Sequence, residues 1–357
     1  NNKRIKRIMA YSPITKASSF FNTKLYSGNG STNSITGVGL QPDMVWIKTR
    51  NLSGYNHNLY DAVRGVTKIL KPSATGVEIT SATSLTAFDS DGFSFGGTGT
   101  GEINQSNGTY ASWNWKANGQ GSSNTDGTIN STYTSANTTS GCSIVTYTGN
   151  GTAGATVGHG LGVVPKLMIV KSRSTAGENW IVYHASLGAT KYMVLASTTA
   201  PVTSAGAWNN TAPTSTVFSL TDSGGDTNRT GETYVAYCFS EVQGYSAFGQ
   251  YRGNAVATDG TFVNTGFKPS LVIQKRTDGA EPWFMFDDKR QGYNSENEYL
   301  LSNSTDAEGT SNRIDLLSNG FKLMTTDGGN NANGGPYLYM AFGQTLVGSN
   351  NVPANAR

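Results

Sequence analysis

The chain has 357 residues, which is room for about two or three domains of ordinary size. Only 14% of the residues are charged and the net charge is +3, too slight to indicate a nucleic-acid partner. No apolar run is long enough to span a membrane, so membrane insertion is not expected. The 44 glycines exceed the usual ~7%, and with the abundant Asn, Ser and Thr they are typical of a β-rich protein with many turns.

A short basic segment, KRIKR, begins at residue 3. Its cations are Lys3, Arg4, Lys6 and Arg7. We expect residues 1–18 to form an arm that docks onto a neighbouring subunit. The alternatives are a contact with nucleic acid or a membrane surface, and a plain solvated end.

A Gly-x-x-Pro motif that leads into an apolar segment occurs three times, as GLQPDMVWIK (39–48), GVVPKLMIVK (162–171) and GFKPSLVIQK (266–275). A phosphate-binding loop is excluded, because such a loop follows a strand and opens a helix, whereas these glycines precede a strand. The motif instead predicts a turn, with proline at the start of the strand, where no ladder hydrogen bond is lost. Its fixed members are Gly39, Pro42, Lys48, Gly162, Pro165, Lys171, Gly266, Pro269 and Lys275.

Other landmarks keep the same order and similar spacing in each copy, which indicates three tandem repeats. Each copy has a Tyr-x-Gly-Asn turn before the motif and a second aromatic segment near its end. The turns begin at Tyr26, Tyr147 and Tyr251, and the later segments begin at Tyr110, Tyr234 and Tyr337. Chance similarity of one short motif does not explain several landmarks in one order.

The segments suggested as strands are short, aromatic or β-branched, and bounded by Gly, Asn, Asp and Ser. Examples are MVWIK (44–48), NWIVYH (179–184), TVFSL (216–220) and TYVAYCF (233–239). We therefore predict an all-β protein of three tandem antiparallel β-sandwich, jelly-roll-like repeats. The predicted units are an arm (1–18), repeat 1 (19–117), a flexible or loosely draped Gly/Ser/Thr/Asn-rich linker (118–141), repeat 2 (142–243), and repeat 3 with a C-terminal tail (244–357).

Residues able to carry chemistry are few. The histidines, His57, His159 and His184, show no metal-ligand spacing, and His57 aligns with Trp180 and Trp283 of the other copies. Cys142 and Cys238 lie near the first and last strands of repeat 2, where a disulfide is conceivable but two separate buried thiols are favoured. No catalytic residue, metal or cofactor is predicted.

Three weaker possibilities remain from the residues. The acids Asp61, Glu281, Asp287 and Asp288 could serve glycoside hydrolysis, although an ion-paired turn explains the last two more simply. The loops DSGGDTN (222–228) and TTDGGNN (325–331) cluster oxygen ligands suited to calcium, although ordinary turns explain them too. Sugar-stacking aromatics are possible at Trp113, Trp208 and Trp283, although aromatic residues also fill sandwich interiors.

The motif GHGLGVVPKLMIVKSR (158–173), the turn YTGNGT (147–152) and the ending YLYMAFGQTLVGSNNVPANAR (337–357) resemble tandem repeats of bacteriophage virion proteins, especially tail-fibre and related structural proteins of marine phages. The resemblance covers nearly all of the chain after about residue 19. It implies a part of the virion that carries no cofactor, and it transfers no catalytic residue, because the shared motifs are turns and core strands.

The expected function is therefore that of a non-enzymatic tail-fibre or appendage subunit that contributes to host attachment. A protein that decorates the capsid head is the first alternative, and a tailspike-type enzyme that degrades polysaccharide is the second. Expected partners are further copies of the chain in a homotrimer or larger assembly, other virion proteins, and a host-surface glycan or protein. The expected location is the virion, on a tail appendage rather than on the head.

Overall fold

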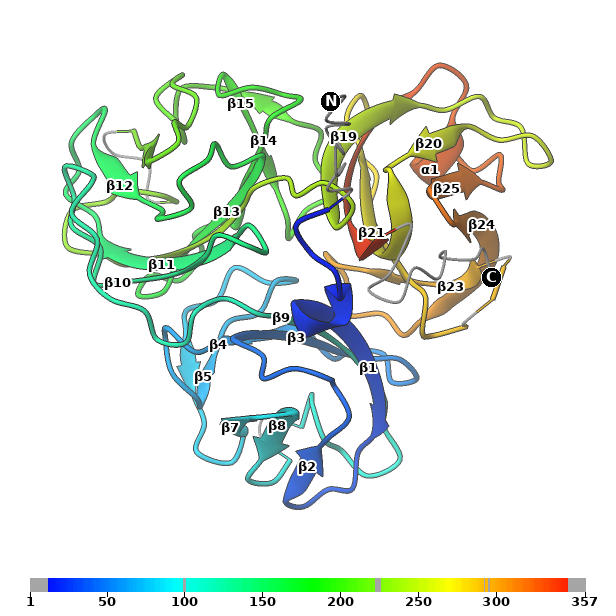
Figure 1. The fold of residues 1–357 in the computed structure, drawn as a ribbon, viewed down its shortest axis with the longest axis horizontal. Coiled ribbons are helices and arrows are strands. Elements are labelled where there is room, and N and C mark those ends of the chain that lie inside the picture. Colours follow the sequence, from blue (N-terminus) through cyan, green and yellow to red (C-terminus); the bar gives the residue numbers. More distant parts are fainter. Residues whose placement is uncertain (1–11, 99–100, 222–225, 292, 295, 346–357) are drawn as a thin grey trace, which may run out of the picture.

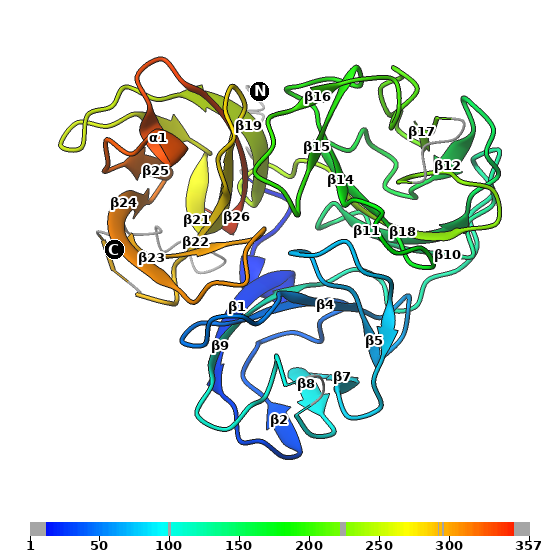
Figure 2. The ribbon, with the colours of Figure 1, turned by 180° about the vertical axis from the view of Figure 1, so that it is seen from behind.

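Three lobes of antiparallel β-structure surround a common centre (Figures 1 and 2). The structure, a computed structural model, describes residues 12–98, 101–221, 226–291, 293–294 and 296–345. Within these ranges nearly every regular element is a strand, so the predicted all-β fold class is confirmed. No helix in the described ranges is long and apolar enough to cross a membrane.

The elements follow the three lobes in chain order. Lobe 1 is preceded by a 3₁₀ turn, η1 (Ala17–Ser19), and contains β1 (Phe21–Ser27), β2 (Asn33–Ile35), β3 (Met44–Thr49), β4 (Asn58–Asp61), β5 (Lys68–Ile69), β6 (Ile79–Thr80), β7 (Leu85–Asp89), β8 (Gly92–Phe95) and β9 (Thr109–Trp115). Lobe 2 contains β10 (Tyr133–Asn137), β11 (Cys142–Thr148), β12 (Thr156–Gly158), β13 (Leu167–Ser172), β14 (Ile181–His184), β15 (Lys191–Val194), β16 (Val202–Thr203), β17 (Val217–Ser219) and β18 (Thr233–Phe239). Lobe 3 contains β19 (Ser246–Arg252), β20 (Phe262–Asn264), β21 (Phe267–Arg276), β22 (Trp283–Asp287), β23 (Glu296–Leu301), β24 (Gly309–Leu317), β25 (Gly320–Leu323), α1 (Gly328–Asn331) and β26 (Pro336–Thr345).

The same strand order recurs in each lobe. The main sheet runs β1-β9-β3-β4 in lobe 1, β11-β18-β13-β14 in lobe 2 and β19-β26-β21-β22 in lobe 3. The first and last long strands of each lobe therefore lie side by side, and the strand of the Gly-x-x-Pro motif flanks them. The segments predicted as strands fall on β3, β14, β17 and β18.

The repeated tyrosines stack in pairs inside each lobe. Because the first and last long strands pair in the same register, Tyr26 lies opposite Tyr110, and their rings are 5.0 Å apart and nearly parallel. The other two pairs, Tyr147 with Tyr234 and Tyr251 with Tyr337, have ring distances of 5.2 and 4.8 Å. The repeated landmarks thus mark one packing device on the outer face of each main sheet, where a local core forms.

The inner faces of the three main sheets meet in one shared hydrophobic core. Trp115 of β9, Phe239 of β18 and Phe342 of β26 occupy equivalent positions in their strands and contact one another. Their ring centroids are 5.4 to 6.4 Å apart, and each side chain is at most 4% exposed. Aromatic residues dominate the energetics of such cores, so this triangle joins the lobes into one body.

The segment predicted as a flexible linker, 118–141, contains an ordered strand. Its residues Tyr133–Asn137 form β10, which pairs with the outer edge of β11. The expectation of a flexible linker is wrong there, because backbone hydrogen bonds to a neighbouring strand do not require apolar side chains. The described part of the predicted arm also packs on the body, since Ile14 is 1% exposed within the shared core.

Candidate functional site: the junctions between the lobes

The lysines that close the repeated motif lie at the three junctions between lobes. Each is fully buried and donates its ammonium to a backbone carbonyl of the adjacent lobe. Lys48 Nζ lies 3.4 Å from Thr305 O, Lys171 Nζ lies 3.4 Å from Thr75 O, and Lys275 Nζ lies 2.9 Å from Thr198 O. The contacts run in one direction around the molecule, from lobe 1 to 3, from 3 to 2 and from 2 to 1.

Burial lowers the pKa of each of these three lysines to about 8. A second carbonyl helps to hold each ammonium, at 3.2 Å for Lys48, 3.0 Å for Lys171 and 2.7 Å for Lys275. Hydrogen bonds that involve a charged donor are stronger than neutral ones. The lysines therefore fasten one lobe to the next, at the end of the strand that each motif begins.

A second set of equivalent residues crosses the same junctions. The indole nitrogens of Trp180 and Trp283 donate to main-chain carbonyls of the adjacent lobe, at 3.0 and 3.1 Å. His57 takes the same position in lobe 1, with Nε2 3.0 Å from Leu301 O. Its Nδ1 accepts from the indole of Trp46 at 2.8 Å, so Nε2 carries the proton. The predicted alignment of His57 with the two tryptophans therefore corresponds to a shared structural role.

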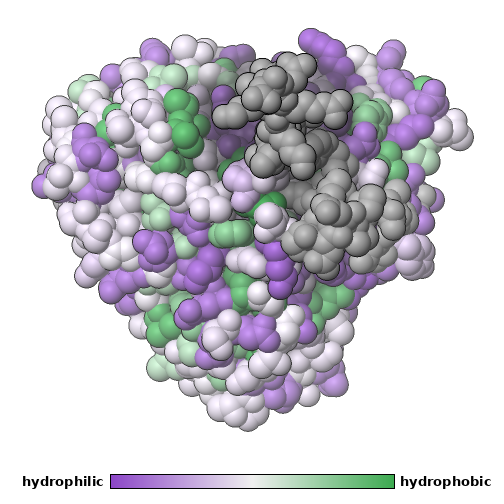
Figure 3. All heavy atoms as spheres, viewed as in Figure 1, coloured by the Kyte–Doolittle hydropathy of each residue, from purple (hydrophilic) through white to green (hydrophobic). Residues whose placement is uncertain are grey.

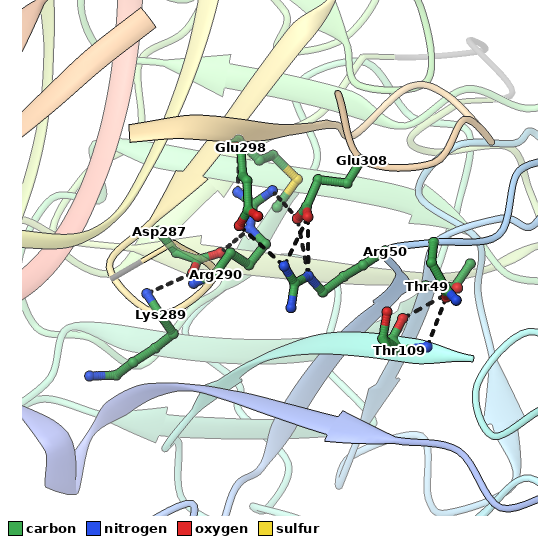
Figure 4. Close-up of polar contacts among 10 residues, drawn as sticks. Thr49, Arg50, Thr109, Asp287, Lys289, Arg290, Glu298 and Glu308 are labelled. Carbon is green, nitrogen blue, oxygen red and sulfur yellow. Dashed lines mark hydrogen bonds and ion pairs between the residues drawn. The ribbon is translucent and has the colours of Figure 1, made fainter. Parts of the chain in front are cut away.

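Ion pairs join lobe 1 to lobe 3 around Glu308 (Figure 4). Arg50 of lobe 1 contacts Glu308 at 2.9 Å and Glu298 at 3.1 Å. On the lobe 3 side, Arg290 bridges Glu308 at 3.1 Å and Asp287 at 2.7 Å, with both Arg290 and Asp287 fully buried. Asp287 also accepts the indole hydrogen of Trp113, 3.1 Å away in lobe 1. Every buried charge here has an opposite partner, as buried charges require.

The junction of lobes 1 and 2 repeats this network. Arg173 of lobe 2 contacts Glu78 at 2.9 Å, Arg64 bridges Glu78 and Asp61, and Tyr237 of lobe 2 donates its hydroxyl to Asp61 at 2.7 Å. Burial raises the pKa of Glu78, but the hydrogen bond from Arg173 and the charge of Arg64 outweigh that effect and leave the pKa below its usual value. The chemistry is again structural charge pairing.

The junction of lobes 2 and 3 differs. His184 and Leu187 occupy the positions that hold an aspartate and an arginine in the other lobes. His184 Nε2 lies 3.2 Å from Tyr339 O of lobe 3, and Nδ1 accepts from Ser186 N at 3.2 Å. Burial lowers the pKa of His184 to about 4, so the ring is neutral at pH 7. A neutral hydrogen bond thus replaces the ion pair at this junction.

The Gly-x-x-Pro motif has the turn geometry that the sequence predicts. Gly39, Gly162 and Gly266 have φ angles of +85°, +72° and +78°, a region that glycine tolerates without a steric penalty. Pro42 and Pro165 precede β3 and β13, and Pro269 lies at an irregularity near the start of β21. The lysine at the end of the motif is the member whose cross-lobe role the sequence did not reveal.

The tryptophans proposed as sugar-stacking residues are buried. Trp113 is 0% exposed, and Trp208 and Trp283 are each 1% exposed, so no glycan can reach their rings. This prediction is wrong, because Trp113 and Trp283 are used in the shared core and Trp208 packs in the core of lobe 2. Surface and core tryptophans cannot be told apart by residue type.

Each of the candidate catalytic acids lies in an ion pair, and only Asp287 and Asp288 are neighbours. Asp61 and Asp287 belong to different junctions, Asp288 lies 3.5 Å from Lys289, and Glu281 lies 3.9 Å from Arg276. They do not face each other across a common cleft, as paired glycosidase acids do.

The remaining candidate residues are placed as follows. Cys142 and Cys238 are free and buried, and burial raises the pKa of both thiols. Asp327 caps α1 and pairs with Arg313 at 2.7 Å. In the described ranges no group of His, Cys, Asp and Glu is arranged to hold a metal ion. Lys3, Arg4, Lys6 and Arg7 lie outside the described residues, as does the start of the 222–228 loop.

One family matches the chain, from residue 16 to residue 345, under the description "Domain of unknown function (DUF7483)". The chain belongs to the DUF7483 family. No curated protein and no solved structure matches it. The DUF7483 match runs from η1 to the last residue of β26, so it takes in all three lobes as one unit. This extent agrees with a core that the lobes share.

Proposed function

We propose that the chain is a structural subunit of a bacteriophage virion, namely a tail fibre or other tail appendage that contributes to host attachment. The observation that carries the proposal is the fusion of three lobes around one aromatic centre, with lysines and ion pairs crossing the junctions. A body whose lobes share one core suits a part that transmits force. The resemblance of the repeats to phage structural proteins is what supports a virion as the particle.

The use of the candidate acids supports a non-enzymatic role. Asp61 and Asp287 are buried in charge pairs that join lobes, which leaves them no access to a substrate in this structure. The surface seen in Figure 3 mixes polar and neutral residues with small apolar patches. Recognition of a host glycan or protein would fall to exposed loops, since the large aromatic side chains named above are interior.

A capsid-decorating role is the second candidate, and the arrangement of the lobes favours it. Three equivalent lobes about one centre give a single chain approximate threefold symmetry, which would match a threefold position on a head. Assembly into a homotrimer stays a prediction. The threefold contacts that a trimer of single repeats would need are already present within one chain.

Immunogold electron microscopy on purified particles of the phage that encodes the chain tests the proposal. Gold along the tail appendages is the expected result, and gold over the head would move the protein to capsid decoration. Absence of the chain from purified particles, checked by immunoblot, would refute any role as a virion component.

A further inference from the structure

A groove of about 590 Å³ lies at the junction of lobes 2 and 3. One wall is the Gly-x-x-Pro turn of lobe 2, with Val163, Val164 and Lys166. The floor is the connection between the lobes, Ser240 to Ser246, and the far wall is the turn at Gly266 in lobe 3. Its size falls in the usual range for binding sites, ~300–1,000 Å³.

Two adjacent valines of this turn are exposed, and Val163 is unusually exposed for its place in the repeat. Val163 is 51% exposed and Val164 is 42% exposed. The residues equivalent to Val163, Leu40 in lobe 1 and Phe267 in lobe 3, are 6% and 0% exposed. In lobe 2 the nearby Leu161 is buried in the local core instead, which leaves both valines outside. Adjacent exposed apolar side chains beside a groove indicate a contact surface.

The chain covers the corresponding places at the other two junctions with its own segments. Between lobes 1 and 2, the segment that contains β10 lies there: Asn137 donates to Ala117 O at 3.1 Å, and Ser140 donates to Lys116 O at 3.1 Å. Between lobes 3 and 1, the stretch that leads into β1 packs against β26, with Ile14 buried in the shared core. The connection between lobes 2 and 3 is short and supplies no such cover among the described residues.

The strand beside the groove, β19, also has no neighbouring strand on its outer side in the described part of the chain. In lobe 2, β10 pairs with residues Cys142 to Thr146 of β11. The equivalent stretch of lobe 3 is Ser246 to Gln250 of β19, the last strand of its sheet. Ser246 forms an isolated bridge with Val242, and the rest of the stretch has no strand beside it among the described residues. An open strand edge offers main-chain donors and acceptors to an added strand.

We propose that this groove and the outer edge of β19 bind an extended segment of a neighbouring virion protein, which adds a strand to β19 as β10 does to β11. The proposal rests on the proposed function, because the occupant is a second component of the same particle.

The chemistry of the occupant follows from β10. The middle of β10 presents small side chains to lobe 2: Thr134 and Ser135 are buried, and Thr134 and Ala136 lie about 3 Å from where a Cβ on Gly160 would be, so larger groups would not fit there. We therefore expect a segment whose residues beside β19 are small, such as Ser, Thr or Ala. A glycan is disfavoured, because none of the residues that line the groove is aromatic, and stacking on aromatic rings is a common mode of sugar binding.

Site-specific photo-cross-linking in assembled particles tests the proposal. A photo-reactive amino acid is placed at Val164, and in a matched control at Val256, which is 39% exposed but does not line the groove. We expect an adduct between this chain and another virion protein from position 164 and none from position 256. Failure to form that adduct, in particles that contain the chain, overturns the proposal and leaves the proposed function standing. An adduct with a second copy of the chain also overturns it, since the partner is then the chain itself.

A pair of variants that each introduce a negative charge strengthens the test. Val164→Asp should lower incorporation of the chain into particles at least tenfold without changing its thermal midpoint in isolation, because an exposed residue contributes little to folding. Val256→Asp should leave incorporation unchanged. Equal incorporation of both variants would overturn the proposal, whereas absence of the unaltered chain from particles would remove the proposed function and this proposal together.

Discussion

Replacing Phe342 by alanine should weaken the whole molecule, because this side chain contacts all three lobes. Phe342 is 2% exposed, and its ring lies 5.6 Å from Trp115 of lobe 1, 5.4 Å from Phe239 of lobe 2 and 5.7 Å from Phe248 of lobe 3. Truncation of a buried phenylalanine typically costs about 3–5 kcal/mol, from lost transfer free energy and from the cavity left behind. We expect the upper part of that range, since rings from three sheets cannot all move inward.

Urea unfolding followed by tryptophan fluorescence measures this change in the free energy of unfolding. Every lobe contains tryptophan, so the fluorescence signal reports on all three lobes. The tryptophans are Trp46, Trp113 and Trp115 in lobe 1, Trp180 and Trp208 in lobe 2, and Trp283 in lobe 3. Phe262→Ala is the matched control, because Phe262 is 45% exposed in the same lobe and should change the stability by about 0.5 kcal/mol or less. A loss below about 1 kcal/mol for Phe342→Ala would refute the reasoning.

Three further predictions follow from the junctions and the buried thiols. Arg290→Leu leaves Asp287 and Glu308 without their buried partner and should lower the free energy of unfolding by about 3–5 kcal/mol in a urea titration. Asp287→His combined with Arg290→Leu should recover part of that loss, because lobe 2 has His184 and Leu187 at the same positions. No recovery would contradict the equivalence of these positions. Burial lowers the pKa of His184 from 6.5 to about 4, so between these pH values the unfolded chain binds a proton that the folded chain does not. The contribution of His184 to stability is therefore complete above pH 6.5 and is lost as the pH falls to 4. At pH 5 the loss of stability amounts to about 2 kcal/mol, at 1.36 kcal/mol per pKa unit. His184→Gln should therefore flatten the pH dependence of the urea midpoint, and an unchanged slope would contradict this role of His184. Cys142 and Cys238 are buried with free thiols, so a thiol reagent should label neither in the native protein and both in urea; rapid native labelling would contradict the packing of repeat 2.

Sequence reasoning reached the repeats because their landmarks carry local information. A glycine with positive φ at Gly162, or a tyrosine stacked on its cross-strand neighbour as Tyr147 is on Tyr234, is required by one lobe alone and therefore recurs in each copy. The fold class followed from short strands between turn residues. These features depend on neighbours that pattern and spacing can indicate.

The arrangement of the lobes could not be predicted in the same way. The triangle of Trp115, Phe239 and Phe342 joins residues that share a repeat position but not an amino acid, and any of them could equally have faced its own lobe. The lysines gave a usable signal, since a cation kept in all three copies of a chain with only 14% charged residues is unusual. A lysine at a strand end is ordinarily solvated, so its role as a cross-lobe donor became visible only with Thr198 beside Lys275.

Composition also misled at the linker and the tryptophans. The segment 118–141 has few apolar residues, yet β10 is held by main-chain hydrogen bonds that composition does not report. Trp113 was a candidate for sugar binding because residue type does not reveal which face of a strand is buried, and here both faces of the main sheet are covered.

Differential scanning calorimetry on the intact chain tests most directly the central claim that the three lobes form one cooperative body. A shared core predicts a single transition in which the calorimetric and van't Hoff enthalpies agree. Separate transitions, or a calorimetric enthalpy well above the van't Hoff value, would show that the lobes unfold independently and would contradict the account.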